Sequence, residues 1–233
     1  MRQLVRVSTP ALREMVLATV ESYQLMRDKR RRALEIYGHV WGYQRFVDDL
    51  VIYMVETVSI SASSKSTHNS VEPNPEALEL KQGIMERWYP QLTLLGDFHS
   101  HPYDTLSEVM RPDDDDPQAK GFEFSSADIR SFKRDDVIWE SASGHPLMLV
   151  MTICKLDRVR ESQETNVRNN VQVFTIGEFR FWLNACAGHP VAGRKTTKRG
   201  VSKDRNSSLL MDIFPTAYNE ARDRLLQEHS AHD

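Results

Sequence analysis

The hydrophobic positions of the chain follow two periods, one typical of helices and one typical of strands. Apolar residues recur at spacings of three and four between Leu12 and Met26, directly after Thr9 and Pro10. This pattern predicts a helix in which Thr9 can cap and Pro10 suits the first position. Shorter apolar runs at 36–41 and 50–60 predict two antiparallel strands.

The same periods predict the remaining elements. These are a helix from Asn74 to about Tyr89, a strand at 91–101 that ends at Pro102, a helix at 125–140, strands at 145–156, 171–176 and 178–186, a hairpin turn at Gly177, and a final helix from Pro215 to Glu228. Polar composition predicts loops at 61–75, 103–124 and 194–205. Together the elements indicate an α/β fold, with a mixed, mostly antiparallel sheet flanked by helices.

Composition narrows the class of protein. The chain has 233 residues, of which 40% are hydrophobic and 27% charged, as in ordinary soluble globular proteins. A net charge of -3 predicts no general affinity for nucleic acid. Two cysteines, Cys154 and Cys186, with no CxxC arrangement favour a reducing compartment. The N-terminus lacks a signal-like apolar region and the longest apolar run, 147–154, is too short to span a bilayer. We therefore expect a cytoplasmic protein without a membrane partner; the sequence leaves the oligomeric state open.

The heptapeptide GDFHSHP, residues 96–102, places His99 and His101 two positions apart on an expected strand. Side chains at i and i+2 point to the same face, so the two imidazoles can converge on one metal ion. They can equally be two polar residues where a strand meets a loop. A catalytic zinc site typically has three protein ligands, so a third ligand is needed.

Asp128 is the best third ligand. It lies in SSADIRSF, three residues after Ser125 and at the start of an expected helix. An S-x-x-D pattern in this position is also typical of a capping box, in which Ser125 caps the helix and Asp128 folds back. The two interpretations are compatible, because the N-terminus of a helix can hold both side chains on one side.

Three separated parts of the chain now carry a resemblance to a known family. Glu35 in LEIYGHVWG, H-S-H-P at 99–102 and S-x-x-D at 125–128 resemble the JAMM motif of the JAB/MPN metalloprotease family, E…H-x-H-P-x7-S-x-x-D. The order of expected elements over residues 10–185 is also similar. The resemblance implies an MPN/JAB, cytidine-deaminase-like architecture over 1–188, with insertions at 61–75 and 103–124, and a basic loop and C-terminal helix over 189–233 packed on it.

The resemblance also implies roles for individual residues. His99, His101 and Asp128 would bind Zn²⁺, Glu35 would hold the bound water, and Ser125 would donate a hydrogen bond to the oxyanion. Members with a complete motif are mostly isopeptidases that cleave after the C-terminal glycine of ubiquitin or a ubiquitin-like protein. The expected partner is therefore such a protein, or its conjugates, with its extended tail in the site. The short, single-domain chain resembles stand-alone bacterial members, including those of antiviral operons.

Two alternative functions remain open at this stage. The first is a hydrolase that matures a sulfur-carrier-like or ubiquitin-like precursor with the same zinc chemistry. The second is a non-catalytic MPN scaffold, which binds partners and usually lacks metal ligands. The presence of all five motif residues weighs against the scaffold.

The spacing departs from the family pattern between Pro102 and Ser125, where residues 103–124 form a longer segment. Ungapped spacing would put Met110 and Asp113 in the Ser and Asp positions, but Met110 has no hydroxyl and MRPDDDDP offers no helix to aim a ligand.

The acidic run of this segment, Asp113, Asp114, Asp115 and Asp116, is either a solvated loop or a means of steering basic ubiquitin-like tails. His145 and His189, each followed by proline, are expected to be turn residues away from the metal.

Overall fold

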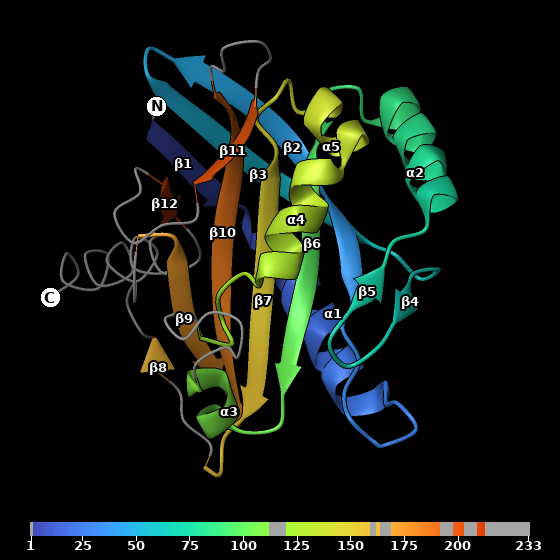
Figure 1. Cartoon of the computed structure of the whole chain (residues 1–233), viewed down its shortest axis with the longest axis vertical. Helices are drawn as coiled ribbons and strands as arrows, with labels where there is room; N and C mark the ends of the chain where they lie inside the picture. The colour runs from blue at the N-terminus through green and yellow to red at the C-terminus, as the bar shows by residue number, and fades with distance from the viewer. Residues whose placement is uncertain are drawn as a thin grey trace, which may run out of the picture.

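A computed structural model describes residues 2–111, 120–158, 162–163, 169–191, 198–202 and 209–212. In this part of the chain a 10-stranded sheet runs in the order β12-β1-β3-β2-β6-β7-β10-β9-β8, with β11 paired to β10 (Figure 1). Helix α1 covers one face of the sheet, and α4 and α5 lie across the other. The expected mixed α/β fold with a mostly antiparallel sheet is confirmed.

The strands of the large sheet are β1 (Arg2–Val7), β2 (Tyr37–Val47), β3 (Leu50–Ile60), β6 (Thr93–Tyr103), β7 (Leu147–Lys155), β8 (Ser162–Gln163), β9 (Val171–Ile176), β10 (Phe179–Val191), β11 (Lys198–Ser202) and β12 (Leu209–Asp212). A separate two-stranded sheet consists of β4 (Lys65–Ser66) and β5 (Val71–Glu72). The helices are α1 (Thr9–Leu25), α2 (Pro75–Trp88), α3 (Leu106–Met110), α4 (Ser126–Arg134) and α5 (Asp136–Ser141). The pair β6–β7 and the two pairs made by β1 are parallel.

Most predicted elements are confirmed, with shifts of a few residues at their ends. The first helix begins at Thr9 and is capped by Ser8, whose side chain accepts a hydrogen bond from the Ala11 N–H, so the expected cap at Thr9 is one residue too late. Asn74 caps α2 as its sequence indicates. The hairpin between β9 and β10 turns at Gly177, which adopts the positive φ of 60° that favours glycine.

Several local predictions need correction. The expected loop at 61–75 contains the two short strands β4 and β5. Strand β1 was not predicted, because Gln3 occupies a buried position and breaks the apolar alternation. The helix expected at 125–140 is two helices, since Asp135 ends α4 and caps α5 by accepting from the Ile138 N–H. The expected loop 103–124 contains α3, which is too short for a periodic pattern. The expected basic loop contains β11.

The expected domain boundary at position 188 falls inside β10. Two other predictions concern residues that the structure does not describe. The expected final helix at 215–228 and the acidic run at 113–116 lie outside the described residues. No helix in the described ranges is long and apolar enough to cross a membrane.

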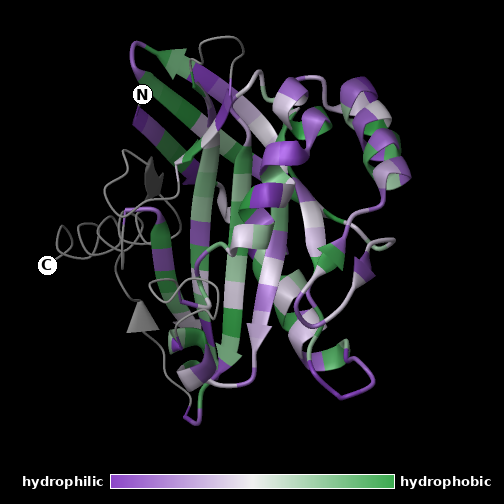
Figure 2. Ribbon diagram, viewed as in Figure 1, coloured by the Kyte–Doolittle hydropathy of each residue, from purple (hydrophilic) through white to green (hydrophobic). Residues whose placement is uncertain are grey.

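Many residues of the central strands are hydrophobic (Figure 2), and they pack into clusters on both faces of the sheet. The larger cluster lies between α1 and the sheet and includes Leu95, Phe98 and Phe181. On the opposite face one cluster lies beneath α4 and α5 and includes Trp41 and Phe132. A third cluster, around Phe122, Cys154 and Trp182, lies beside α3. The polar site described next lies on the face that carries the second and third clusters.

Candidate metal centre

The two histidines of the H-x-H-P motif lie on β6 and face α4 rather than α1. A β-bulge decides this orientation. Val40 of β2 pairs with Gly96, and the next residue, Trp41, pairs with Leu94, so that Leu95 is the extra residue. Leu95 therefore points into the same core as Phe98, and the following odd-numbered residues point to the other face. The bulge thus directs His99 and His101 to the face of the sheet that α4 covers.

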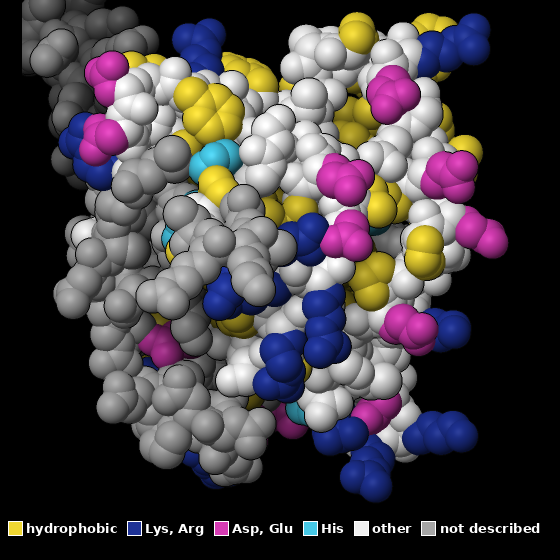
Figure 3. All heavy atoms as spheres, turned by 45° about the horizontal axis from the view of Figure 1, so that its top comes forward, with side chains coloured by type: hydrophobic (Ala, Val, Ile, Leu, Met, Phe, Trp, Pro, Cys, Tyr) yellow, Lys and Arg dark blue, Asp and Glu magenta, His cyan; other side chains and the backbone are white. Residues whose placement is uncertain are grey.

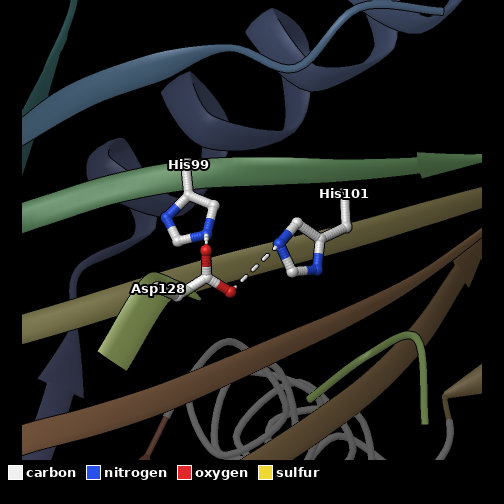
Figure 4. Close-up of side chains that lie close together, drawn as sticks. All are labelled: His99, His101 and Asp128. Carbon is white, nitrogen blue, oxygen red and sulfur yellow. Dashed lines mark ion pairs between the residues drawn. The ribbon is translucent and has the colours of Figure 1, made fainter. Parts of the chain in front are cut away.

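Asp128, in the first turn of α4, completes the group (Figure 4). The His99 Nε2 atom lies 3.5 Å from Asp128 Oδ1, and His101 Nε2 lies 3.6 Å from Asp128 Oδ2. One ligand atom from each of the three residues falls within 4.8 Å of the other two. A group of two imidazoles and one carboxylate at this separation can hold a metal ion.

Asp128 has a capping role in addition to its place beside the histidines. Its N–H donates to Ser125 Oγ at 3.1 Å, and the Ser125 N–H donates to Asp128 Oδ2 at 2.7 Å. Both halves of the capping box are therefore formed. The cap fixes the carboxylate orientation, because Oδ2 accepts from the backbone while Oδ1 faces His99. The two interpretations of S-x-x-D coexist in one geometry.

The hydrogen bonding of the histidines fits a metal better than it fits a simple ion pair. A separation of 3.5 Å is too long for a good N–H···O hydrogen bond, and His99 Nε2 has no other hydrogen-bond partner among the described residues. A buried polar nitrogen without a partner is costly, and a cation between it and Asp128 would remove that cost. His101 Nδ1 lies 3.2 Å from the Gly121 carbonyl oxygen, which leaves Nε2 to face Asp128.

The carboxyl groups and imidazoles of the site shift one another's pKa values. Burial alone would lower the pKa of His99, but the neighbouring carboxyls of Asp128, Asp97 and Glu35 reverse the effect and raise it to about 8. For Asp128, burial acts to raise the pKa, and the two histidines outweigh it and hold the pKa well below its usual range. A metal ion bound here would need the neutral form of His99 and the ionised form of Asp128.

Glu35 lies in the extended segment just before β2 and beside β6. The Ile36 N–H donates to Ser100 Oγ at 3.0 Å, and the Ser100 N–H donates to the Ile36 carbonyl at 3.1 Å. Since Tyr37 pairs with His99, these bonds continue the pairing of the two strands and set Glu35 on the face of the histidines. Glu35 is 6% exposed, and burial raises its pKa to about 8.

One cavity of about 360 Å³ contains all five motif residues. Its floor is formed by the sheet and its sides by α4 and by the segment that joins β4 to β5. The lining residues are Glu35, Tyr37, His68, Asn69, Ser70, Val71, Pro73, Asp97, His99, His101, Pro102, Tyr103, Ser125, Ala127, Asp128, Ser131, Phe132, Asp135 and Met148. The predicted loop at 61–75 therefore supplies one wall of the cavity.

Neither the family models nor the curated proteins with which the chain was compared give a match. The functional assignment of the site therefore rests on its geometry and on the spacing of its motif.

Two polar residues of this face were not predicted from the sequence. Asp97 precedes His99 by two positions, and its Oδ1 atom is buried with no hydrogen-bond partner in the described structure. Burial raises the pKa of Asp97 to about 7. His39 pairs with Asp97 across β2 and β6 and is also buried. The spacing of Asp97, His99 and His101 was a usable signal for the first residue, whereas nothing near His39 distinguished it.

The other histidines singled out from the sequence lie apart from this group. His145 precedes β7 as a turn residue, as predicted. His189 lies within β10 and pairs with Gly200 of β11, so its assignment to a turn was wrong.

Charged residues of both signs are spread over the face of the molecule seen in Figure 3, with hydrophobic side chains between them.

Proposed function

We propose that the protein is a zinc-dependent peptidase or isopeptidase that cleaves after the C-terminal glycine of ubiquitin or a ubiquitin-like protein. The observation that carries this proposal is the convergence of Glu35, His99, His101, Ser125 and Asp128 on one cavity, although they come from three separated parts of the chain. These are the residues of the JAMM motif, in its order. The longer segment between Pro102 and Ser125 does not prevent their convergence.

His99, His101 and Asp128 would hold Zn²⁺, since imidazole and carboxylate are ligands that zinc accepts in catalytic sites. Zinc bound there would supply a Lewis acid that polarises a carbonyl and lowers the pKa of bound water. Glu35, buried beside the ligands, would take a proton from that water in its ionised form and deliver it to the leaving amine. A cation bound at the ligands would favour this ionised form and oppose the effect of burial on the Glu35 pKa.

Ser125 would stabilise the developing negative charge. Its hydroxyl oxygen accepts from the Asp128 N–H, so the single hydroxyl proton is left to donate into the cavity. Hydrogen-bond donors placed where an oxyanion forms commonly make a large contribution to amide hydrolysis.

The shape of the cavity supports a narrow, extended substrate. The segment between β4 and β5 faces α4 across the site, and its residues His68, Asn69 and Ser70 line the cavity. An extended chain that ends in glycine can pass between such walls with little steric conflict and can pair with exposed backbone. A ubiquitin-like tail has this form.

The decisive experiment incubates the protein with fusions of ubiquitin-like proteins, with and without a chelator. We expect cleavage after the terminal glycine, loss of cleavage with chelator, and loss in Glu35→Gln, which keeps the size of the side chain and removes the carboxyl that would accept the proton. Glu21→Gln, an exposed position on α1, is the matched control and should cleave normally. Cleavage that survives chelation or Glu35→Gln would refute the mechanism.

Zinc analysis of the purified protein separates the enzyme from a scaffold. A protein free of zinc after growth in zinc would favour a non-catalytic scaffold. Asp128→Ala should lose zinc and Asp113→Ala should retain it, whereas the opposite result would move the third ligand to the acidic run.

The acidic run at 113–116 is proposed to steer basic tails toward the site. Changing its four Asp residues to Asn should lower cleavage at low salt and flatten its dependence on ionic strength. Salt curves that coincide with those of the unaltered protein would remove the steering proposal and leave the zinc chemistry untouched.

A further inference from the structure

The segment between the motif parts, residues 103–124, returns to the metal centre through the backbone of Gly121. The Gly121 carbonyl oxygen lies 3.2 Å from His101 Nδ1. A carbonyl oxygen only accepts hydrogen bonds, so this contact requires the proton of the neutral imidazole to be on Nδ1. The lone pair is then on Nε2, the atom that faces Asp128. The contact thus selects the tautomer that a metal ligand needs.

The same carbonyl is held from a second side by the sheet. Thr152 Oγ1 donates to the Gly121 carbonyl at 3.3 Å. Thr152 is fully buried on β7 and pairs directly with His101 of β6, so both side chains stand on one face of neighbouring strands. Thr152 and His101 therefore donate to a single oxygen that has two lone pairs to offer.

The absence of a side chain at Gly121 lets the Tyr103 ring lie close to this peptide. A Cβ atom at this position would lie 2.6 Å from the ring of Tyr103, the last residue of β6. The backbone of Tyr103 is held in place, because its carbonyl accepts from the Tyr23 hydroxyl of α1 at 3.0 Å. An added Cβ at position 121 would therefore require the Tyr103 ring or the Gly121 backbone to shift. The Gly121 N–H donates to the Val109 carbonyl of α3 at 2.9 Å, which holds the peptide from the other end.

The next residue anchors this backbone to the far strands of the sheet. The Phe122 ring stacks on Trp182 at an interplanar angle of 5°, and its carbonyl accepts from Asn184 Nδ2 at 3.1 Å. Asn184 Oδ1 in turn accepts from Asn170 Nδ2 at 2.9 Å. Both asparagines are 2% exposed, so these bonds are shielded from water.

We infer that the end of the 103–124 segment is an outer coordination shell of the metal centre, in which the Gly121 carbonyl, positioned by Thr152, fixes His101 as an Nε2 ligand. The inference rests on the proposed metal site and adds that Gly121 and Thr152 are positioning residues for it. Groups that orient a ligating histidine commonly change metal affinity by about 10- to 100-fold when removed. The segment is then part of the site rather than an insertion that the site tolerates.

The test compares Thr152→Val, which keeps the shape and removes the hydroxyl, with Thr152→Ser, which retains it. Thr175→Val is the matched control, because Thr175 is a buried threonine of β9 whose hydroxyl has no hydrogen-bond partner among the described residues. Zinc affinity is measured by competition with a chromophoric chelator. We expect about tenfold weaker zinc binding in Thr152→Val and an affinity within about twofold of the unaltered protein in the other two variants.

A second readout follows the tautomer of His101 in the metal-free protein by its imidazole nitrogen shifts. We expect the Nδ1–H form in the unaltered protein and a mixture of tautomers in Thr152→Val and in Gly121→Ala. Unchanged zinc affinity together with an unchanged tautomer in either folded variant would overturn the inference. If the unaltered protein bound no zinc, the proposed function would fail first, and the tautomer measurement alone would still decide the role of Gly121.

Discussion

The two faces of β6 differ in what their side chains do, although the same strand provides both. Toward α1, Leu95 and Phe98 are fully buried among apolar neighbours. Toward α4, Asp97 and His99 are almost as deeply buried, and each has a polar atom without a hydrogen-bond partner in the described structure. One face is packed as a core, and the other keeps buried polar groups whose hydrogen bonds are not all made.

This difference shows which face serves stability and which serves function. Burying apolar surface favours folding, whereas burying a polar atom without a partner costs about 1–3 kcal/mol. The polar face is bounded by apolar clusters around Trp41 on one side and Trp182 on the other, so apolar side chains could have continued across it. The retained polar groups indicate a binding site, and a bound cation would offset part of the cost of burying them.

The largest effect should come from the apolar face. Phe98→Ala removes a fully buried ring and should lower the free energy of unfolding by about 3–5 kcal/mol, through lost burial and a residual cavity. Denaturant unfolding with chelator present measures it. The zinc bound per folded molecule should not change, because Phe98 points away from the ligands. Loss of zinc from the folded fraction would show that the two faces are not independent.

On the polar face, removal of a ligand should abolish stabilisation by zinc. Zinc at about 100 times its dissociation constant should raise the free energy of unfolding of the unaltered protein by about 2.7 kcal/mol. His99→Ala should lose this increment while remaining folded with chelator present. His145→Ala removes a buried histidine that is not part of the group His99, His101 and Asp128, so this variant should keep the stabilisation by zinc. An equal zinc response in His99→Ala would place the ion elsewhere.

A third change should stabilise the polar face. His39 is 1% exposed, and its Nδ1 atom has no partner among the described residues, so His39→Leu should raise the free energy of unfolding by about 1 kcal/mol or more at pH 8. Burial lowers the pKa of His39 to about 4, with a smaller effect from Lys81 of α2. The neighbouring carboxyl of Asp97 is present in both proteins.

The advantage of His39→Leu should increase in acid. Below the unfolded pKa of about 6.5, His39 of the unfolded chain binds a proton, whereas folded His39 stays neutral down to about pH 4. The free energy of unfolding therefore decreases as the pH is lowered from about 6.5 to about 4. The leucine variant lacks this loss. Unfolding curves of both proteins at several pH values measure the difference, and a constant difference would contradict the burial of a neutral imidazole.

The sequence predicted the site residues that belong to a short local pattern better than it predicted the groups that contact them. Spacing of two residues placed His99 and His101 on one face, and S-x-x-D placed Ser125 and Asp128 at the start of a helix. Both patterns are local, so a single segment contains the whole signal. Glu35 has no local signal of its own and was selected only because the rest of the motif was present.

The remaining features depend on contacts between distant segments. The bulge at Leu95, which decides the face that the histidines occupy, is visible only when β2 and β6 are paired. Position 121 acts through its backbone carbonyl, and a carbonyl oxygen is present in every type of residue. Only its position beside His101 makes this oxygen special. Backbone groups leave no mark in the amino-acid pattern, so the outer part of the site could not be predicted.

The smallest change in stability should come from Ser125, which caps α4 and, in the proposed mechanism, also donates a hydrogen bond to the oxyanion. As the cap of α4 it accepts from the Asp128 N–H, and Ser125→Ala should lower the free energy of unfolding by about 1 kcal/mol. Ser125→Gly should cost only about a few tenths of that, since glycine is tolerated at this position. Both variants lack the hydroxyl and should cleave ubiquitin-like fusions about 100-fold more slowly, while Ser125→Thr should retain both properties. Full cleavage by Ser125→Gly would restrict Ser125 to the cap and leave the oxyanion without this donor.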